Sequence, residues 1–380
     1  MSSGVRIRQV RAQVYRYPID APVSTSFGVM NDRPAVFVRV DDEDGFTGWG
    51  EIWCNFPVCG AEHRARLVAT IFAPLLKGKQ FEQPHAAWRE LTVATSVLAL
   101  QSGEPGPIAQ CIAGIDIALH DLVARRAGQP LWKMLGGSSP LIRVYASGLN
   151  PDQPERLAQQ CLNEGHRAFK LKVGFGIERD ADNVEAVRNA IGNRCALMVD
   201  ANQAWKLDQA PEVAAALQRF DLQLLEEPLR ADAPWSEWQQ FAQRCDIPLA
   251  AGENIASAQA FEQALASRAL TVVQPDIAKW GGFSGCLSVA KKISESGARF
   301  CPHFLGGGIG LLASAHLLAV AGGDGMLEID ANMNPMRTAL AGPLAQISDG
   351  TAMLTDQPGL GAISDPSDDE QTARWLCAIY

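Results

Sequence analysis

The chain lacks the features that mark several special protein classes. Its nine cysteines are odd in number and form neither a C-x-x-C pair nor a zinc-like spacing, so the sequence indicates no zinc site. The acidic residues behind its net charge of −9 are spread along the chain rather than gathered in an acidic tail. That distribution argues against a surface for polyanions, and we expect no nucleic-acid partner.

Long apolar segments are also absent. Arg8, Arg11 and Arg16 interrupt the first thirty residues, which therefore contain no signal-peptide core. The longest apolar run, near Leu311 to Ala321, contains His316 and falls short of the ~20 residues of a membrane span. Most cysteines are then expected to be small buried apolar residues in a reducing compartment. We expect a cytoplasmic protein with no membrane partner.

Periodicity divides the chain into segments. Polar and apolar residues alternate in 5–17 and 35–40 and a turn at Asp44-Gly45 leads into 46–51, which predicts a small antiparallel sheet. Helical periodicity follows in 61–76, 86–100 and 107–127, the last with a single apolar stripe. Together these segments predict an α+β capping domain over residues 1–130.

The middle of the chain follows a different pattern. From about residue 140 to 340, short apolar runs alternate with helical patterns, which predicts a parallel sheet closed as a barrel. We therefore expect an α/β protein with a barrel domain over 131–340. Residues 341–380 show no continuing alternation and are expected to fold back on the capping domain. A length of 380 residues with 47% hydrophobic content is ample for such a set of domains.

Residues able to bind a metal or move a proton recur at the ends of the apolar runs. They are Lys172, Asp200, Glu226, Glu253, Asp276, His303 and Glu328, and successive positions differ by 28, 26, 27, 23, 27 and 25. Such an interval is about the length of one strand, loop and helix unit. Side chains at the carboxyl ends of successive barrel strands converge on one mouth. The series therefore predicts a single site.

Three of these residues have the character of metal ligands. Asp200, Glu226 and Glu253 follow three consecutive strands, which would bring three carboxylates together. Buried like charges repel unless a cation neutralises them, and hard oxygen ligands suit Mg²⁺ or Mn²⁺. Strand alternation points Glu227 away from Glu226, and both ion pairing and support of the metal ligands stay open for it.

Two candidate bases lie on opposite sides of the predicted mouth. Lys170 and Lys172 form K-x-K, so period-two geometry aims both ammonium groups to one face. Adjacent lysines beside a dication should lower each other's pKa and prepare one of them to act as a base. Across the barrel, Asp276 on the sixth strand could hold one imidazole nitrogen of His303 on the seventh.

This arrangement suits removal of the proton next to a carboxylate, with Lys172 and His303 flanking the substrate. The metal and Lys170 would bind the carboxylate oxygens and stabilise an enediolate, a Lewis-acid contribution of about several kcal/mol. Asn202 could donate a hydrogen bond to substrate. Glu328 could hydrogen-bond the same oxyanion if it is protonated.

The motifs around these residues resemble those of the enolase superfamily, in its mandelate racemase subgroup. The matching motifs are G-W-G-E at 48–51, A-G-I-D-I-A-L-H-D at 113–121, K-L-K at 170–172, D-A-N at 200–202, E-E-P at 226–228, G-E-N at 252–254, P-D-I-A-K-W-G-G at 275–282, and His303. The resemblance implies a capping α+β domain on a modified TIM barrel of the (β/α)7β type. It also implies Mg²⁺, one per subunit, on Asp200, Glu226 and Glu253, a small carboxylate substrate, and a homo-oligomer between dimer and octamer.

Finer resemblances concern the substrate. Asp276 stands where muconate-lactonizing relatives have a lysine, which favours the racemase-like subgroup. K-V-G-F-G at 172–176, P-H-F-L-G-G-G at 302–308 and E-I-D-A-N-M-N-P-M-R at 328–337 resemble members that act on acid sugars, especially the galactarolactone cycloisomerase type. Substrate choice in the family lies mainly in two capping loops, here Val23 to Met30 and Trp53 to Cys59. The second loop carries Trp53 and Phe56 as substrate contacts and no cation.

Several outcomes are compatible with this site. We expect dehydration or lactone cycloisomerisation of a sugar-acid-like carboxylate, whereas return of the proton to the opposite face would give a racemase or epimerase of an α-hydroxy or α-amino acid. A Schiff-base aldolase using Lys170 or Lys172 would need no metal. A phosphate site at Gly306 to Gly308 is a further barrel function, and a catalytically silent binding protein is the non-enzyme alternative.

Overall fold

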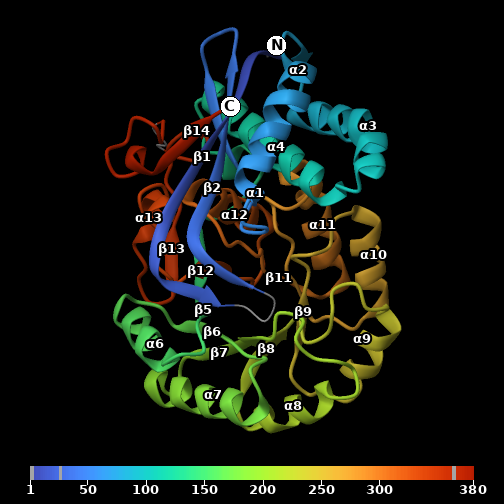
Figure 1. The fold of residues 1–380 in the computed structure, drawn as a ribbon, viewed down its shortest axis with the longest axis vertical. Helices are drawn as coiled ribbons and strands as arrows, with labels where there is room; N and C mark the ends of the chain where they lie inside the picture. Colours follow the sequence, from blue (N-terminus) through green and yellow to red (C-terminus); the bar gives the residue numbers. More distant parts are fainter. Residues whose placement is uncertain (1–3, 25–27, 362–364) are drawn as a thin grey trace.

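The computed structural model describes residues 4–24, 28–361 and 365–380. A capping layer built mainly from the N-terminal part of the chain lies over a barrel, as Figure 1 shows. The capping sheet has the order β14-β1-β2-β3, with β4 paired to β1. The elements of the capping layer are β1 (Val5–Ser24), β2 (Val29–Asp42), β3 (Thr47–Ile52), β4 (Gln80–Phe81), β14 (Leu376–Ile379), α1 (Gly60–Leu67), the π-helical turn Val68–Phe72, α2 (Ala73–Leu76), α3 (Pro84–Ser102) and α4 (Pro105–Arg126).

The predicted antiparallel sheet is present, but its hairpin is longer than predicted. Strands β1 and β2 stay paired as far as Ser24 and Val29, with an irregular register after Pro18. Proline and aspartate between Pro18 and Pro22 interrupt the polar-apolar alternation, so the sequence signal ends before the pairing does. The hairpin runs from the capping layer to the mouth of the barrel (Figure 1).

Helix α4 is the central element of the cap. The prediction of one apolar stripe was too narrow, because α4 is buried on nearly all sides between β3 and the barrel helices, and even Asp116, His120 and Asp121 are buried. By length and composition α4 could cross a membrane, but 83% of its apolar 18-residue stretch is buried inside the fold. Its apolar composition is therefore explained by its place in the core.

The barrel has eight parallel strands with seven intervening helices, which confirms the predicted (β/α)7β architecture. The strands follow the order β11-β10-β9-β8-β7-β6-β5-β12. Their bounds are β5 (Leu141–Leu149), β6 (Ala168–Lys172), β7 (Ala196–Asp200), β8 (Leu222–Glu226), β9 (Leu249–Ala251), β10 (Val272–Val273), β11 (Arg299–Phe300) and β12 (Leu327–Asp330). The intervening helices are α6 (Pro154–Asn163), α7 (Ile177–Ile191), α8 (Ala210–Leu217, followed by a 3-10 turn at Gln218–Phe220), α9 (Trp235–Ala242), α10 (Ala258–Ser267), α11 (Gly282–Ser296) and α12 (Gly308–Ala321).

The remaining elements connect the two layers. They are α5 (Leu131–Met134), α13 (Pro335–Thr338), the 3-10 turns Gly342–Ala345 and Ala373–Trp375, and β13 (Thr351–Met353). Strand β13 pairs with β5 of the barrel, and β14 pairs with β1 of the cap. The C-terminal part of the chain therefore contacts both layers.

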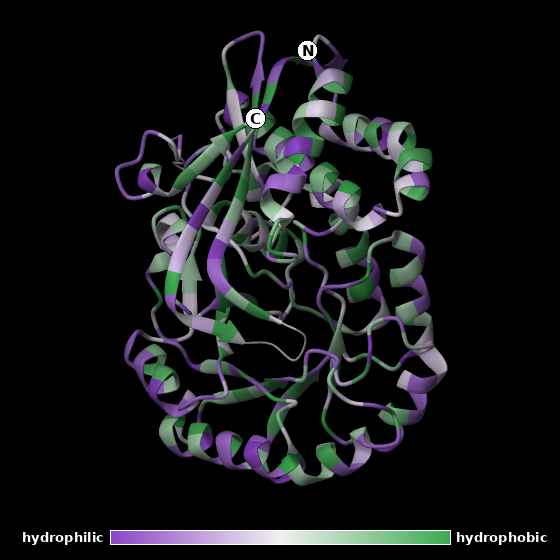
Figure 2. Cartoon of the chain, in the orientation of Figure 1, coloured by the Kyte–Doolittle hydropathy of each residue, from purple (hydrophilic) through white to green (hydrophobic). Residues whose placement is uncertain are grey.

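The barrel interior is filled in two layers. The lower layer is apolar and includes Ala168, Met198, Leu224, Val272 and Met326. Because strand side chains alternate with period two, the residues two positions further along also point inward, and these are polar. Figure 2 shows hydrophobic colour along the barrel strands and mixed colour on the surrounding helices. The lower layer thus forms a packed floor beneath the polar strand ends.

Close approach of β3 to α4 holds the cap sheet against the central helix of the cap. A Cβ at Gly50 would lie 2.0 Å from the carbonyl oxygen of Gly114 and 2.8 Å from the backbone nitrogen of Ala118. We expect Gly50→Ala to lower the free energy of unfolding by about 1–3 kcal/mol, because backbone atoms must move apart. Urea denaturation checks this, with Gly106→Ala as control, since a Cβ there meets nothing within 4 Å. Equal stability of the two variants would contradict this account of the packing.

Candidate active site

A buried polar layer lies directly above the apolar floor. Its members are Lys170, Asp200, Glu226, Gln274 and Glu328, each two residues beyond a floor residue and each at most 2% exposed. The register pairs Lys172 with Asp200 and Asp200 with Glu226 on neighbouring strands. The structure therefore brings together the strand-end residues that the sequence spacing predicted.

Both lysines are paired with carboxylates inside the barrel. Lys170 Nζ contacts a carboxylate oxygen of Glu226 and lies 2.8 Å from Glu328 Oε1. Lys172 Nζ lies 2.6 Å from Asp200 Oδ2. The two ammonium groups point to the same interior, as the K-x-K alternation predicted.

The predicted lowering of the lysine pKa values was conditional on a dication, and among the side chains alone the pKa values of both lysines are raised. Burial and the charge of Lys170 act to lower the pKa of Lys172, but the neighbouring carboxylate of Asp200 outweighs them, and the pKa is raised. Burial acts the same way on Lys170, yet Glu226 and Glu328 raise its pKa well above the usual value. In this arrangement carboxylates from neighbouring strands hold both lysines.

The histidine on the opposite side has the predicted partner. His303 Nδ1 and Asp276 Oδ2 are 2.7 Å apart, and Asp276 Oδ1 accepts backbone N–H groups of Ala278 at 2.8 Å and Lys279 at 3.1 Å. His303 Nε2 lies 2.5 Å from Glu253 Oε2. Burial acts to lower the pKa of His303, but Glu253 and Glu328 raise it well above the usual value. Asp276 therefore fixes which imidazole nitrogen faces the centre of the site.

Glu328 does not have the protonated form that was considered for it. Burial alone would raise its pKa, but the charges of Lys170 and His303 dominate and lower it to about 2. It accepts hydrogen bonds from the hydroxyl of Ser147 and from Phe304 N at 3.2 Å. Glu328 is thus an ionised acceptor that holds Lys170 and the loop after β11.

The predicted metal ligands lie at or just beyond the ends of neighbouring strands, each beside a cationic side chain. Asp200 contacts Lys172, Glu226 contacts Lys170, and Glu253 contacts His303. With these pairs formed, no three His, Cys, Asp or Glu side chains within the described ranges are arranged to hold a metal ion. Lysine and imidazole nitrogens therefore contact some of the carboxylate oxygens that would bind a metal ion.

The chemistry of this oxygen set nevertheless suits a hard dication. Lys170 and Gln274 both donate to Oε2 of Glu226, and among the described residues no hydrogen bond to Oε1 is seen. Glu227 is buried with φ +40°, its Oε1 accepts from Asn254 at 2.8 Å, and its Oε2 has no partner. Burial first, then neighbouring carboxylates, raise the pKa of Glu226 to about 7 and that of Glu227 to about 8. An added cation would bind oxygens that lack a hydrogen-bond donor and would lower the raised pKa values of these carboxyl groups.

A cavity of about 210 Å³ lies above these residues, where the cap meets the barrel mouth. Its lining residues are Trp53, Asn55, Phe56, Lys172, Asn202, Gln203, Glu253, Asn254, Lys279, His303 and Leu305. The structure therefore places Trp53, Phe56 and Asn202 at the cavity together with both predicted bases. Asn202 Nδ2 donates to Asp200 Oδ2 at 3.0 Å, which orients this amide at the cavity floor. Of the other predicted loop, residues 25–27 lie outside the described residues.

One cation at this cavity was not predicted from the sequence. Lys279 Nζ lies 4.5 Å from the centre of the Trp53 ring and 3.1 Å from both Glu253 Oε1 and Asn254 Oδ1. The loop Trp53 to Cys59 carries no cation of its own, but the barrel supplies one against it. The lysine within P-D-I-A-K-W-G-G was the available signal, since it follows Asp276 by three residues.

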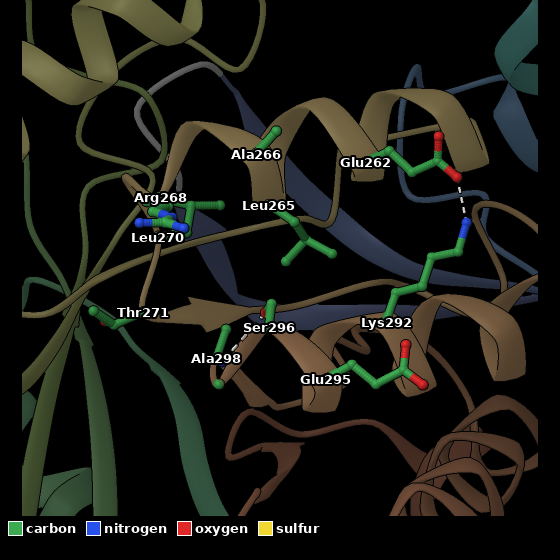
Figure 3. Close-up of a pocket in the computed structure, with 11 residues that line it drawn as sticks. Glu262, Leu265, Ala266, Arg268, Leu270, Thr271, Lys292, Glu295, Ser296 and Ala298 are labelled. Atoms are coloured by element: carbon green, nitrogen blue, oxygen red, sulfur yellow. Dashed lines mark hydrogen bonds and ion pairs between the residues drawn. The ribbon is translucent and has the colours of Figure 1, made fainter.

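A larger hollow of about 860 Å³ lies elsewhere, between α10 and α11. Figure 3 shows Lys292 reaching across it to Glu262, with Leu265 between the helices. None of the predicted site residues lines this hollow. Of its charged side chains, Lys292 and Glu262 pair with each other, and the hollow offers no counterpart to the cluster at the strand ends.

The glycine loop after β11 does not offer a phosphate site. The backbone N–H groups of Gly307 and Gly310 both donate to the carboxylate of Glu51, a cap residue. An internal anion therefore already fills the position that a phosphate would take at the start of α12. The phosphate-barrel alternative is wrong for this reason.

Two family models match most of the chain. The model described as the mandelate racemase / muconate lactonizing enzyme N-terminal domain matches residues 7–136. The model described as enolase C-terminal domain-like matches residues 153–368. These ranges correspond to the capping layer and the barrel.

Characterised relatives match over nearly their whole lengths. The L-talarate/galactarate dehydratase of Salmonella typhimurium is 34% identical, covering 98% of this chain and 92% of the relative. The 3,6-anhydro-alpha-L-galactonate cycloisomerase of Streptomyces coelicolor is 31% identical, covering 94% and 97%. The D-Ala-D/L-Ala epimerase of Cytophaga hutchinsonii is 25% identical, covering 93% and 95%.

Solved structures agree with the fold. A mandelate racemase/muconate lactonizing enzyme from Bordetella bronchiseptica is 55% identical with a TM-score of 0.91, covering 95% of this chain and 98% of its own. The Salmonella typhimurium dehydratase, solved with Mg and L-lyxarohydroxamate, is 28% identical with a TM-score of 0.85, covering 99% and 94%.

Proposed function

Because the chain belongs to the mandelate racemase and muconate lactonizing enzyme family of the enolase superfamily, we propose that it removes the α-proton of a sugar-acid carboxylate with the help of Mg²⁺. Dehydration or lactone cycloisomerisation would follow from the resulting enediolate. The observation that carries this proposal is the position of Lys172 and His303 on one small cavity above the strand-end carboxylates.

The metal would be held by Asp200, Glu226 and Glu253, with Mn²⁺ as a possible substitute. Bound there, a divalent ion supplies Lewis-acid stabilisation of the charge that develops on the substrate carboxylate. The open oxygen of Glu226 and the raised pKa of that residue support this assignment. Glu227, with its buried free oxygen, stands next to this set as a further acceptor.

The chain's own groups would divide the proton transfers between two sides. Lys172 and His303 each take or return the α-proton on their own side of the substrate. Asp276 holds the imidazole through Nδ1, so Nε2 is the nitrogen that acts. Lys170, fixed by Glu226 and Glu328, is a cation in place to hold the substrate carboxylate.

The cavity lining supports a hydroxylated substrate. Asn55, Asn202, Gln203 and Asn254 present carboxamides, and Lys279 presents a cation, all on one cavity. Such groups pair with hydroxyl and carboxylate groups of a ligand. Trp53 and Phe56 would exclude water above it. The names of the dehydratase and cycloisomerase relatives point to the same class of substrate.

A racemase or epimerase of an α-hydroxy or α-amino acid is the second candidate. Opposed bases on one carbon are what inversion of configuration requires, and an epimerase is among the relatives. The two candidates share the first step and differ in whether a β-hydroxyl leaves.

Incubation in D₂O with Mg²⁺ tests both candidates. The substrates to be tried are galactarate, L-talarate, galactarolactone and a set of monoacid sugars. Each reaction is followed by proton NMR. Formation of a 2-keto acid supports dehydration, isomerisation of the lactone supports cycloisomerisation, and α-deuterium in recovered acid with inversion supports epimerisation. If no acid or lactone shows α-exchange or conversion, the proposal is wrong. Borohydride trapping of a carbonyl substrate in EDTA-treated protein would instead favour a Schiff-base enzyme.

We retain two further proposals from the sequence. The domain boundaries are 1–130, 131–340 and 341–380, and limited proteolysis with mass spectrometry can locate them. Assembly of the chain as a homo-oligomer between dimer and octamer can be measured by light scattering.

A further inference from the structure

Glu51 joins the cap to the loop that carries His303. It is 2% exposed, and its two oxygens accept the backbone N–H groups of Gly307 and of Gly310, the latter at 2.8 Å. A Cβ at Gly306 or Gly307 would lie 2.8 or 2.9 Å from Glu51 Oε1. The glycines therefore make room for this carboxylate at the first turn of α12.

Asp116 makes the same kind of contact with the neighbouring helix. Asp116 Oδ2 accepts Ser284 N at 3.0 Å, and Oδ1 accepts the Ser284 hydroxyl at 2.5 Å, in the first turn of α11. A Cβ at Gly282, where φ is +53°, would lie 2.3 Å from Asp116 Oδ2. A second cap carboxylate is thus inserted at a second barrel helix.

The two helices follow the strands of the His303–Asp276 pair. Helix α11 follows β10 and the loop with Asp276, and α12 follows β11 and the loop with His303. A third cap residue, Asn55, donates to Leu305 O at 2.8 Å, two residues beyond His303. The cap therefore contacts both loops at their backbone.

The loop after Lys172 is held from within the barrel instead. Asp180 of α7 accepts Gly174 N at 2.8 Å and Phe175 N at 3.1 Å. The two sides of the cavity thus depend on different carboxylates, from the cap on the histidine side and from the barrel on the lysine side.

We infer that Glu51 and Asp116 are positioning residues that set His303 and Asp276 against the substrate, while Lys172 is positioned independently of them. The inference rests on the proposed function. It gives a role to the G-W-G-E motif and to the glycine pairs at 281–282 and 306–307, which the chemistry alone leaves unexplained.

The physical basis is the helix N-terminus. Carboxylates that accept first-turn N–H groups form charge-assisted hydrogen bonds and match the positive end of the helix dipole. Glu51 adjoins Gly50, and Asp116 lies between Gly114 and Ala118, at the closest approach of β3 and α4. The two carboxylates therefore lie on the same closely packed part of the cap. A displacement of about 1 Å at a reacting group can reduce a rate by about 10².

The test uses Glu51→Gln and Asp116→Asn in the full-length, Mg²⁺-loaded protein. A carboxamide keeps the shape but presents an NH₂ group to one of the two donors. The matched control is Asp121→Asn, a buried α4 carboxylate that accepts Trp49 N at 2.8 Å and Leu360 N at 2.7 Å, away from both loops. Galactarate and L-talarate, which differ in configuration at one α-carbon, serve as probes in D₂O.

We expect Glu51→Gln and Asp116→Asn to slow α-exchange from the His303 side about tenfold or more. Exchange from the Lys172 side should stay within about twofold in both variants, and Asp121→Asn should change neither side by more. Equal losses on both sides, or no loss on the histidine side, would overturn the inference. Absence of exchange in the unmodified protein would count against the proposed function instead.

A second measurement is independent of substrate. Hydrogen exchange with mass spectrometry should show faster deuterium uptake over residues 301–312 in Glu51→Gln and over 278–288 in Asp116→Asn. Uptake over 172–178 should be unchanged. Unchanged uptake over the first two segments would overturn the inference whatever the probes show, and either variant alone suffices if the other does not fold.

Discussion

Replacing either base should remove α-proton exchange from one side of the substrate only. Lys172→Ala should leave exchange on the histidine side, and His303→Asn should leave exchange on the lysine side. Each lost base is expected to reduce its own exchange rate by about 10²–10⁴, the usual contribution of a positioned general base. Exchange of each α-epimer in D₂O, followed by proton NMR, gives the two rates separately.

Chemically matched variants outside the cavity serve as controls. Lys292→Ala removes a lysine paired with Glu262 between α10 and α11, and His63→Asn removes a histidine 3.0 Å from Glu104 in the cap. Both should retain both exchange reactions. Retention of both exchange reactions in Lys172→Ala or His303→Asn would show that the two-base assignment is wrong.

The positions of these residues followed from spacing alone. An interval of 23 to 28 residues between Lys172 and Glu328 is set by the length of a strand, loop and helix. Parallel strands then place every such residue at one end of the barrel. The contact between His303 and Asp276 could be predicted for the same reason, because β10 and β11 are neighbours.

The ionisation states could not be predicted in this way. The sequence places Lys170 beside Lys172 but does not show that Glu226, Glu328 and Asp200 surround them. Those partners come from other strands, and among the side chains alone they raise the pKa values of both lysines. The sequence also does not show that Lys170 and His303 lie beside Glu328 and lower its pKa, against the protonated form on which its proposed role depended.

Contacts between the cap and the barrel also could not be predicted from the sequence. Gly306 to Gly308 has the composition of a phosphate loop, and only the folded chain places Glu51 on it. Lys279 belongs to a recognisable motif, but its position over Trp53 depends on how the cap sits on the mouth. Local patterns specify strands and helices, whereas pairs separated by more than 200 residues depend on the docking of the two layers.

Removal of the metal should have the largest effect on activity. We expect EDTA-treated protein to lose turnover and Mg²⁺ to restore it, because the Lewis acid lowers the activation barrier by about several kcal/mol. Mg²⁺ should also raise the melting temperature, since an ion that binds only the folded protein stabilises it by ~2.7 kcal/mol at 100 times its Kd. Full turnover after exhaustive chelation would contradict the metal assignment.

Calorimetry on two adjacent variants can then identify the ligand. Glu226→Gln removes a charge whose Oε1 has no hydrogen bond among the described residues, and we expect it to weaken Mg²⁺ binding by at least about tenfold, or ~1.4 kcal/mol. Glu227→Gln removes an equally buried charge on the neighbouring residue and should weaken binding less, because strand alternation directs Glu226 into the barrel. Both variants lose one negative charge, so a general electrostatic effect would weaken binding equally in the two. A larger loss in Glu227→Gln would instead assign the ligand to its unpartnered Oε2.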